Sequence, residues 1–165
     1  MRSLRTEGSP PGAAGFTLLE LAVVLALLGA ILLTAIPRLS IFEEAAFRSD
    51  ARKVAALIRQ LDDSSASEKS WYRLKFDIGG RSFEAEKSLD GAVFAKLEGM
   101  PGRVNLGRTT GITGLVQSGS SQKTGAAFVF FEPGAGAEPF SISLESGGKS
   151  CTISYNPYSG KVKII

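Results

Sequence analysis

The sequence predicts an α+β fold, in which a long amino-terminal helix precedes a mostly antiparallel β-sheet domain. Two patterns support this prediction. Residues 16–61 are first continuously apolar and then apolar at helical spacing. From Ser70 onward, apolar and polar residues alternate as they do in half-buried strands. With 165 residues, the chain is long enough for one compact domain and one additional element.

The first helix is predicted from the stretch GFTLLELAVVLALLGAILLTAIP, residues 15–37. Residues 16–36 are apolar or small except for Glu20 and two threonines. At about 1.5 Å per residue they form a helix about 31 Å long, close to the thickness of the hydrocarbon core of a bilayer. We therefore expect residues 16–36 to be a transmembrane helix. A carboxylate there is costly without a partner, and no Lys or Arg follows Glu20 before Arg38.

Three interpretations of this stretch compete, because a basic head with Arg2 and Arg5 precedes it. A secretory signal peptide would need a small-x-small cleavage site after the apolar core, and LTAIPRLS does not supply one. An uncleaved single-pass anchor fits the length but gives Glu20 no partner. Cleavage between Gly15 and Phe16 would create an amino group four residues before Glu20. That amine would neutralise the carboxylate within one helix or between neighbouring copies.

The same stretch closely resembles the class III signal of type IV pilins and type II secretion pseudopilins. The resemblance implies that residues 1–15 are a leader, which a prepilin peptidase removes by cutting after Gly15. It implies N-methylation of the new terminus, Phe16. It also implies that Glu20 is the glutamate required for filament assembly and that Pro37 kinks the helix. The basic residue that the family usually carries before the glycine is replaced here by small residues.

After Pro37, apolar residues recur at helical spacing up to Leu61, with charged residues between them. We expect residues 37–63 to be an amphipathic continuation of the helix and residues 64–165 to be a β-rich globular domain. The polar run at residues 62–70 is expected to end the helix. Its oxygen-rich side chains do not follow the spacing of an EF-hand loop, so no calcium site is expected there.

The first strands of the domain are predicted from alternation. Residues 71–78 alternate between apolar and polar, and Gly79-Gly80 is expected to form a two-residue turn into a strand that carries Phe83 and Ala85. Shorter strands are expected at residues 91–97 and 102–107.

The rest of the domain contains one irregular segment and four more strands. Residues 107–125 are rich in Gly, Ser and Thr and are expected to form a loop, with a short strand at residues 112–116. Residues 126–134 are expected to form a buried strand that ends in a Pro-Gly turn. The last three strands are expected at residues 139–146, 150–157 and 160–165.

The carboxy-terminal layout resembles the GspH/FimT-type minor pseudopilins, one branch of the same family, in the turns at residues 131–134, 147–148 and 159–162. This resemblance implies a pilin-like fold and a role in initiating the pseudopilus, or at its tip, in a type II secretion system. It implies other pseudopilin or pilin subunits, the inner-membrane assembly platform, the lipid bilayer and secreted cargo as partners. It also implies a location in the bacterial inner membrane, with the carboxy-terminal domain in the periplasm. The alternatives are a minor pilin of a type IV or DNA-uptake pilus and, outside the family, a single-pass anchored periplasmic binding domain.

The composition argues against metal, cofactor and nucleic-acid binding. The chain has no histidine, so His-dependent triads and His metal ligands are absent. Cys151, the single cysteine, is expected to be a small buried residue in a strand. The GGKS sequence at residues 147–150 lacks the first glycine of a P-loop. The net charge of +3 comes without a basic run, and Lys161 and Lys163 on one strand are weak support for DNA binding.

The acidic pair Glu84 and Glu86 is the remaining candidate for acid–base chemistry. These residues are two apart on a predicted strand and therefore share one face. Because Arg81 and Lys87 lie close to them in the sequence, the pair is expected to form a solvated edge. No catalytic activity is expected.

Overall fold

The computed structural model describes residues 16–97 and 102–165, without the side chains of residues 33–42. The predicted leader and the cleavage residue Gly15 therefore lie outside the described residues. Pro37 lies within the helix, but its side chain is also outside the description.

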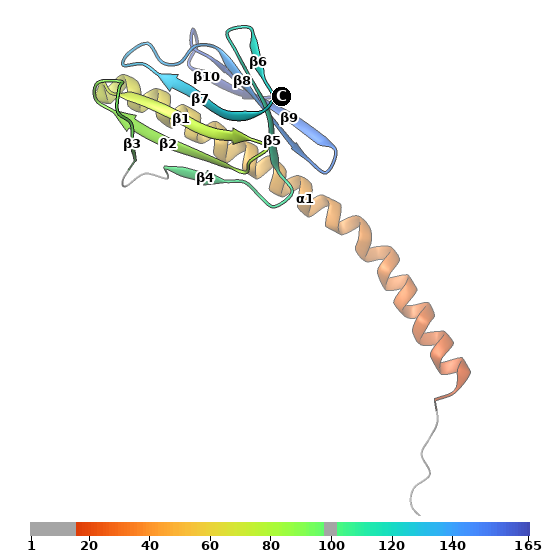
Figure 1. Cartoon of the computed structure of the whole chain (residues 1–165). Coiled ribbons are helices and arrows are strands. Elements are labelled where there is room, and N and C mark those ends of the chain that lie inside the picture. Colours follow the sequence, from red (N-terminus) through yellow and green to blue (C-terminus); the bar gives the residue numbers. More distant parts are fainter. Residues whose placement is uncertain (1–15, 98–101) are drawn as a thin grey trace, which may run out of the picture. The chain divides into compact units, whose positions relative to one another are not determined.

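The described part of the chain contains one helix and ten strands and belongs to two compact units, Met1–Ile41 and Phe42–Ile165 (Figure 1). The helix, α1 (Leu18–Glu68), contributes to both units. The strands all belong to the second unit: β1 (Trp71–Ile78), β2 (Ser82–Ser88), β3 (Ala95–Lys96), β4 (Arg103–Asn105), β5 (Gly111–Gln117), β6 (Ser120–Gln122), β7 (Gly125–Phe131), β8 (Phe140–Ser146), β9 (Lys149–Asn156) and β10 (Lys161–Ile164).

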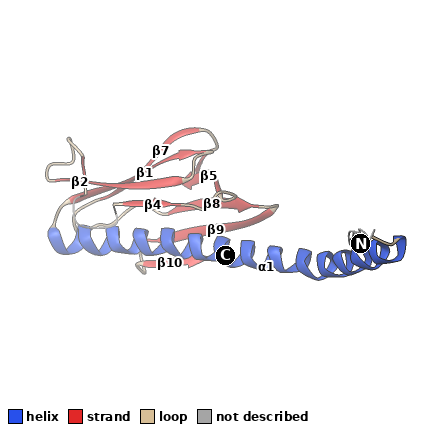
Figure 2. Cartoon of the chain, turned by 90° about the horizontal axis from the view of Figure 1, so that it is seen from below, coloured by secondary structure: helices blue, strands red, loops and turns tan. Residues whose placement is uncertain are grey.

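The strands form two five-stranded sheets. The first has the order β3-β2-β1-β7, with β4 also paired with β2, and the second has the order β10-β9-β8-β5-β6. All pairs between the described strands are antiparallel. The carboxy-terminal part of α1 runs along the strands (Figure 2). The predicted α+β class, a long helix packed on antiparallel sheets, is confirmed.

One face of α1 forms the centre of the core in Phe42–Ile165. Its apolar residues recur every three or four positions, and most charged residues between them are exposed, although Asp50 is buried. The amphipathic helix predicted from the periodicity is therefore present. The helix ends at Glu68, inside the polar run expected to end it, and Lys69 follows with φ 50°, a left-handed conformation common at helix ends. The buried stripe consists of Phe47, Ala51, Val54, Ala55, Leu57, Ile58 and Leu61.

The first sheet places its inner face on this core. Tyr72, Leu74 and Phe76 of β1 are buried, as the alternation predicts. The predicted two-residue turn after β1 is wrong, because the β1–β2 pairing ends at Phe76 and Phe83 and leaves residues 77–82 between them. The glycines instead pair with β5: the Gly79 amide donates to the Ile112 carbonyl at 2.7 Å, and the Ile112 amide donates to the Gly80 carbonyl at 3.2 Å.

The expected loop at residues 107–125 is largely a hairpin. β5 is longer than the short strand predicted, and β6 returns beside it. The prediction failed because a bulge between Ile112 and Gly114 shifts the register against β8. Ile112 and Leu115 are consequently both buried although they are three residues apart, and the period of two disappears.

The last strands follow the prediction closely. β8 and β9 form a hairpin whose pairing ends at Ser146 and Lys149, with Gly147 and Gly148 in the turn. Both glycines have positive φ, as a two-residue turn of this kind requires. β7 differs, because it buries only one face and leaves Phe130 exposed on the other.

Two carboxylates of α1, the buried Asp50 and the half-buried Asp62, bond the helix to the turn after β4 and to strand β9. Asp50 accepts hydrogen bonds from the Gly107 amide at 2.6 Å and the Thr110 hydroxyl at 3.1 Å. Farther along α1, Asp62 accepts a hydrogen bond of 2.6 Å from the hydroxyl of Tyr155. Gly136 packs against that bond: a methyl group on it would lie 2.7 Å from both Asp62 Oδ1 and Tyr155 Oη.

This contact predicts different effects for two nearby glycines that both have positive φ, Gly134 at 78° and Gly136 at 72°. Gly134→Ala is expected to lower the free energy of unfolding by about 1 kcal/mol, the backbone cost alone, since nothing lies within 4 Å of the new methyl. Gly136→Ala is expected to cost about 2–4 kcal/mol, because it also separates Tyr155 from Asp62. Urea unfolding followed by Trp71 fluorescence measures both, and equal losses would contradict the assignment.

The same bond predicts a dependence of stability on alkaline pH. Burial and the hydrogen bond to Asp62 raise the pKa of Tyr155, whereas an unfolded tyrosine has a pKa of about 10. The stabilisation is therefore complete below about pH 10 and is lost as the pH rises through the folded-state pKa.

We expect the free energy of unfolding of the wild type to fall by up to about 1.4 kcal/mol per pH unit above about pH 10. Tyr155→Phe is expected to reduce this slope. Tyr158→Phe removes a phenol as well but keeps the Tyr155–Asp62 bond, so it is the matched control and is expected to keep the wild-type slope. Urea titrations of the three proteins across this range make the comparison. One common slope would rule out Tyr155 as the source.

Candidate functional site

The amino-terminal end of α1 carries the residues that the sequence singled out for function. Thr17 directly precedes the helix, and its hydroxyl oxygen accepts a hydrogen bond of 3.2 Å from the Glu20 amide, which makes Thr17 the N-cap. Glu20 lies in the first turn, where a negative charge is favoured by the helix dipole. Sequence analysis missed this cap, although Thr-x-x-Glu is a recognisable capping pattern.

The helix after this cap presents apolar side chains on all sides. From Leu18 to Leu32, the large apolar side chains are 42–87% exposed, and Glu20 is the only charged residue among them. Phe16 is exposed as well. Among the residues that the structure describes, no helix is long and apolar enough to cross a membrane. Cleavage after Gly15, methylation of Phe16, the assembly role of Glu20 and the kink at Pro37 stay predictions.

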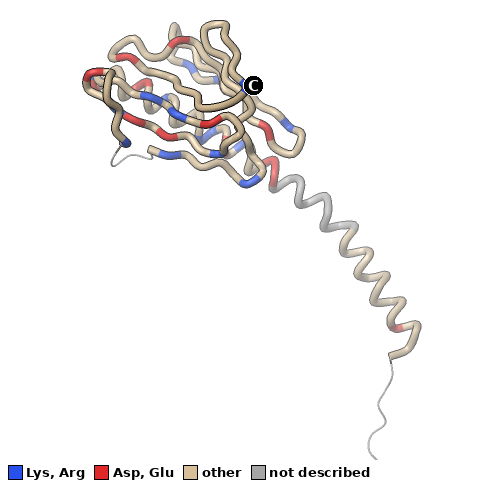
Figure 3. Tube along the Cα trace, in the orientation of Figure 1, with Lys and Arg blue, Asp and Glu red and all other residues tan. Residues whose placement is uncertain are grey.

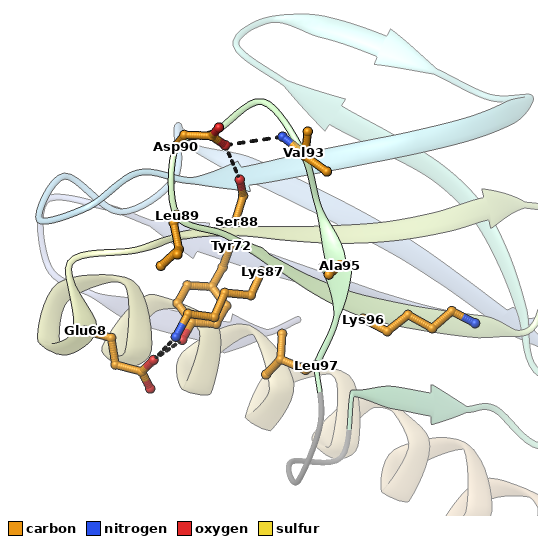
Figure 4. A pocket seen from close by; sticks show the side chains of 10 residues that line it. All are labelled: Glu68, Tyr72, Lys87, Ser88, Leu89, Asp90, Val93, Ala95, Lys96 and Leu97. Carbon is orange, nitrogen blue, oxygen red and sulfur yellow. Dashed lines mark hydrogen bonds and ion pairs between the residues drawn. The ribbon is translucent and has the colours of Figure 1, made fainter.

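An open depression of ≈ 860 Å³ lies beside the carboxy-terminal end of α1 (Figure 4). The Glu68 carboxylate accepts hydrogen bonds from the Tyr72 hydroxyl at 2.7 Å and the Lys87 ammonium at 2.5 Å. The bonds from Lys87 and then Tyr72 lower the pKa of Glu68. Burial and then the bond to Glu68 raise the pKa of Tyr72, and the bond to Glu68 raises that of Lys87.

The opposite wall of this depression is the loop at residues 88–93, which is held by hydrogen bonds within the loop. Asp90 Oδ1 accepts hydrogen bonds from the Ser88 hydroxyl and from the Ala92 and Val93 amides, at 2.9–3.3 Å. The Ala92 amide, then Ser88, then the Val93 amide lower the pKa of Asp90. Leu89 and Val93 stand exposed at 84% and 77%. Apart from Lys96, the polar side chains of the depression thus bond to one another, and its exposed apolar residues suit contact with another surface rather than chemistry.

The predicted solvated edge at Glu84 and Glu86 is wrong for Glu86. Glu86 is only 7% exposed and accepts two hydrogen bonds from Arg73, the residue opposite it on β1. The Arg73 guanidinium lies 4.2 Å from the ring centroid of Phe94 and 5.0 Å from that of Phe128, which shield the pair from water. Glu84 is half-buried, 3.5 Å from Arg103 Nη1.

The remaining residues that the sequence analysis considered lie in the strands and turns of the last three strands, β8 to β10. Cys151 is a free, half-buried thiol in β9 that packs against the core, and burial raises its pKa. The GGKS sequence forms the β8–β9 turn and the start of β9, with no helix after it. Lys161 and Lys163 lie exposed on β10, on either side of the buried Val162.

Comparison with known proteins reveals similarity at the level of the fold. No protein-family model matches the chain, and no curated protein matches its sequence. Two solved structures of the minor pseudopilin EpsH from the type II secretion system of Vibrio cholerae match with TM-scores of 0.60 and identities of 12% and 13%. They cover 73% and 75% of this chain and 95% and 97% of theirs.

The type IV minor pilin FimU of Pseudomonas aeruginosa, strain PAO1, matches with a TM-score of 0.54 and 13% identity. The match covers 76% of this chain and 92% of that one. These structures share the arrangement predicted from the sequence, a long helix packed on antiparallel sheets. The chain therefore has the pilin-like fold of the minor pseudopilins and minor pilins.

Proposed function

We propose that the chain is a non-catalytic structural subunit of a pilus-like filament. The observation that carries this proposal is the contrast between two parts of α1. The part in Phe42–Ile165 has its apolar stripe covered by the two sheets. The part from Leu18 to Leu32 exposes apolar side chains all around. Other molecules must therefore cover this surface: lipid before assembly and neighbouring helices within a filament.

Glu20 is the residue that the filament hypothesis explains best. A carboxylate within an apolar helix needs a partner. After cleavage between Gly15 and Phe16 by a prepilin peptidase, the new α-amino group of Phe16, then N-methylated, supplies a positive charge to Glu20 of the same or a neighbouring subunit. In a packed array this pairing sets the axial register. Pro37, which cannot donate a backbone hydrogen bond, is the proposed point of the helix kink.

The proposed setting is the bacterial inner membrane. Residues 16–36 would lie in the bilayer, and Phe42–Ile165 would lie in the periplasm. The proposed partners are the prepilin peptidase, other pseudopilin or pilin subunits, the inner-membrane assembly platform and secreted cargo. The likeness to EpsH favours a minor pseudopilin of a type II secretion system. The proposed place of such a subunit is the tip or the initiating complex of the pseudopilus.

A minor pilin of a type IV or DNA-uptake pilus is the second candidate. The likeness to FimU, at a TM-score of 0.54, favours it specifically. The genes beside this one distinguish the two candidates, since secretion-system genes and pilus genes form different clusters.

Substitution of the residue before the cleavage site tests processing. Gly15→Val is expected to abolish cleavage, because a branched side chain replaces the hydrogen at the position next to the scissile bond. Co-expression with a prepilin peptidase followed by amino-terminal sequencing measures the result. The wild type should begin at Phe16 and the variant should keep its full length. A wild-type protein that begins elsewhere would overturn the assignment.

Substitution of the acidic residue tests assembly. Glu20→Gln keeps the size of the side chain and removes its charge, so it is expected to leave cleavage near normal. If the charge pair contributes about 1.4 kcal/mol, incorporation into sheared filaments should fall about tenfold. Glu43→Gln removes the same charge from an exposed position on α1 and serves as the matched control. Equal incorporation of both variants would contradict the pairing.

A further inference from the structure

Three arginines line a second open depression, of ≈ 540 Å³, on Phe42–Ile165. Arg81 follows the glycines between β1 and β2, Arg103 begins β4, and Arg108 lies in the turn before β5. No carboxylate is among the lining residues. We call this feature, defined by Arg81, Arg103 and Arg108, the arginine depression.

Two of the guanidinium groups are held in place by neutral partners. Arg81 Nη1 donates to the Arg108 carbonyl at 2.9 Å. Arg103 donates from Nε to Asn105 Oδ1 at 3.1 Å and from Nη2 to Ser82 Oγ at 3.4 Å. These contacts restrict the side chains but leave most of their donors unused, since a guanidinium carries five N–H groups. The arginine depression therefore presents partly preorganised donors for an oxyanion.

The positive charge of the depression is only partly neutralised. Arg103 lies 3.5 Å from Glu84 Oε1. Arg81 and Arg108 have no ion-pair partner among the described residues, and all three side chains are exposed. An anionic group that reached Arg81 and Arg108 would therefore displace no internal carboxylate.

The shape and the surroundings indicate which anion fits. Small-molecule sites are enclosed and mostly apolar, whereas Leu106 is the only large apolar residue in this lining. A nucleic-acid backbone requires a continuous basic surface. Here Asp77 and Glu84 line the adjoining depression, and acidic and basic positions are interspersed over the unit (Figure 3). A surface of mixed charge suits a protein partner, because complementary charges across an interface fix how the two proteins align and disfavour proteins with a different charge pattern.

We propose that the arginine depression binds an acidic segment of a partner polypeptide, whose carboxylates contact Arg81 and Arg108. The site lies outside the apolar part of α1 and requires neither cleavage nor assembly. Failure of this proposal and failure of the filament hypothesis are therefore distinguishable.

The test uses the full chain in uncharged detergent micelles and a fluorescein-labelled peptide of alternating Glu and Gly. Fluorescence anisotropy at low salt measures binding. Arg81→Gln/Arg108→Gln is expected to weaken binding at least about tenfold, the loss of two charge-assisted contacts. Lys161→Gln/Lys163→Gln removes the same charge from the exposed face of β10 and is expected to change affinity by about twofold or less.

Each other outcome overturns the proposal. No binding of the peptide, or an equal loss in the lysine control, would mean that the depression is no acidic-peptide site. Tighter binding of a single-stranded oligonucleotide, lost in the arginine variant, would assign the site to nucleic acid. Displacement of the peptide by millimolar inorganic phosphate would assign it to small anions. Arg108→Gln alone repeats the comparison if the double variant unfolds, because the Arg108 side chain makes no hydrogen bond within the described chain.

Discussion

The β-rich unit depends on one buried stripe of α1. Val54, Ile58 and Leu61 are at most 1% exposed, and both sheets place an inner face on them. Without the helix, the inner faces of the two sheets would be exposed to water, at a cost of about 25 cal/mol for each Å² of apolar surface. The stripe also sets where the polar contacts form. Asp50 and Asp62, on the edges of the same helix, bind the turn after β4 and the Tyr155 hydroxyl. The helix thus supplies the centre of the core and also the carboxylates that bind the turn after β4 and strand β9.

The two parts of α1 differ in which of their faces are apolar. In the Phe42–Ile165 unit, the helix has an apolar stripe that the sheets bury and an opposite face whose charged residues are mostly exposed. Between Leu18 and Leu32 there is no polar face except Glu20. A helix that is apolar all around is stable only when other apolar matter surrounds it. The filament hypothesis meets this requirement, because neighbouring helices would surround the Leu18–Leu32 part. The chain shares the pilin-like fold of minor pseudopilins and minor pilins.

Features with a local period were predictable from the sequence, and features that depend on register were not. The helical spacing up to Leu61 and the β8–β9 hairpin are encoded in consecutive residues, and both predictions are confirmed. The bulge between Ile112 and Gly114 interrupts the alternation of apolar and polar residues, so the full length of β5 was not predicted. Glu86 was misplaced because its partner, Arg73, becomes its neighbour only through the β1–β2 register. The arginine depression escaped prediction for the same reason, since its arginines come from separate segments of the chain.

The two proposed contact surfaces differ in what each one contributes. Apolar helices pack over large areas with little directional preference, so the Leu18–Leu32 surface supplies association without choosing among apolar partners. Charged groups contribute less affinity but discriminate between partners, because a misplaced charge is repelled or left unpaired. The arginine depression, with Glu84 beside it, has this second character. A subunit that enters an ordered assembly needs both properties, since helix packing alone would accept any similar helix. The pilin-like fold separates them, with the apolar surface on α1 and the charged surface on the sheet edges and turns.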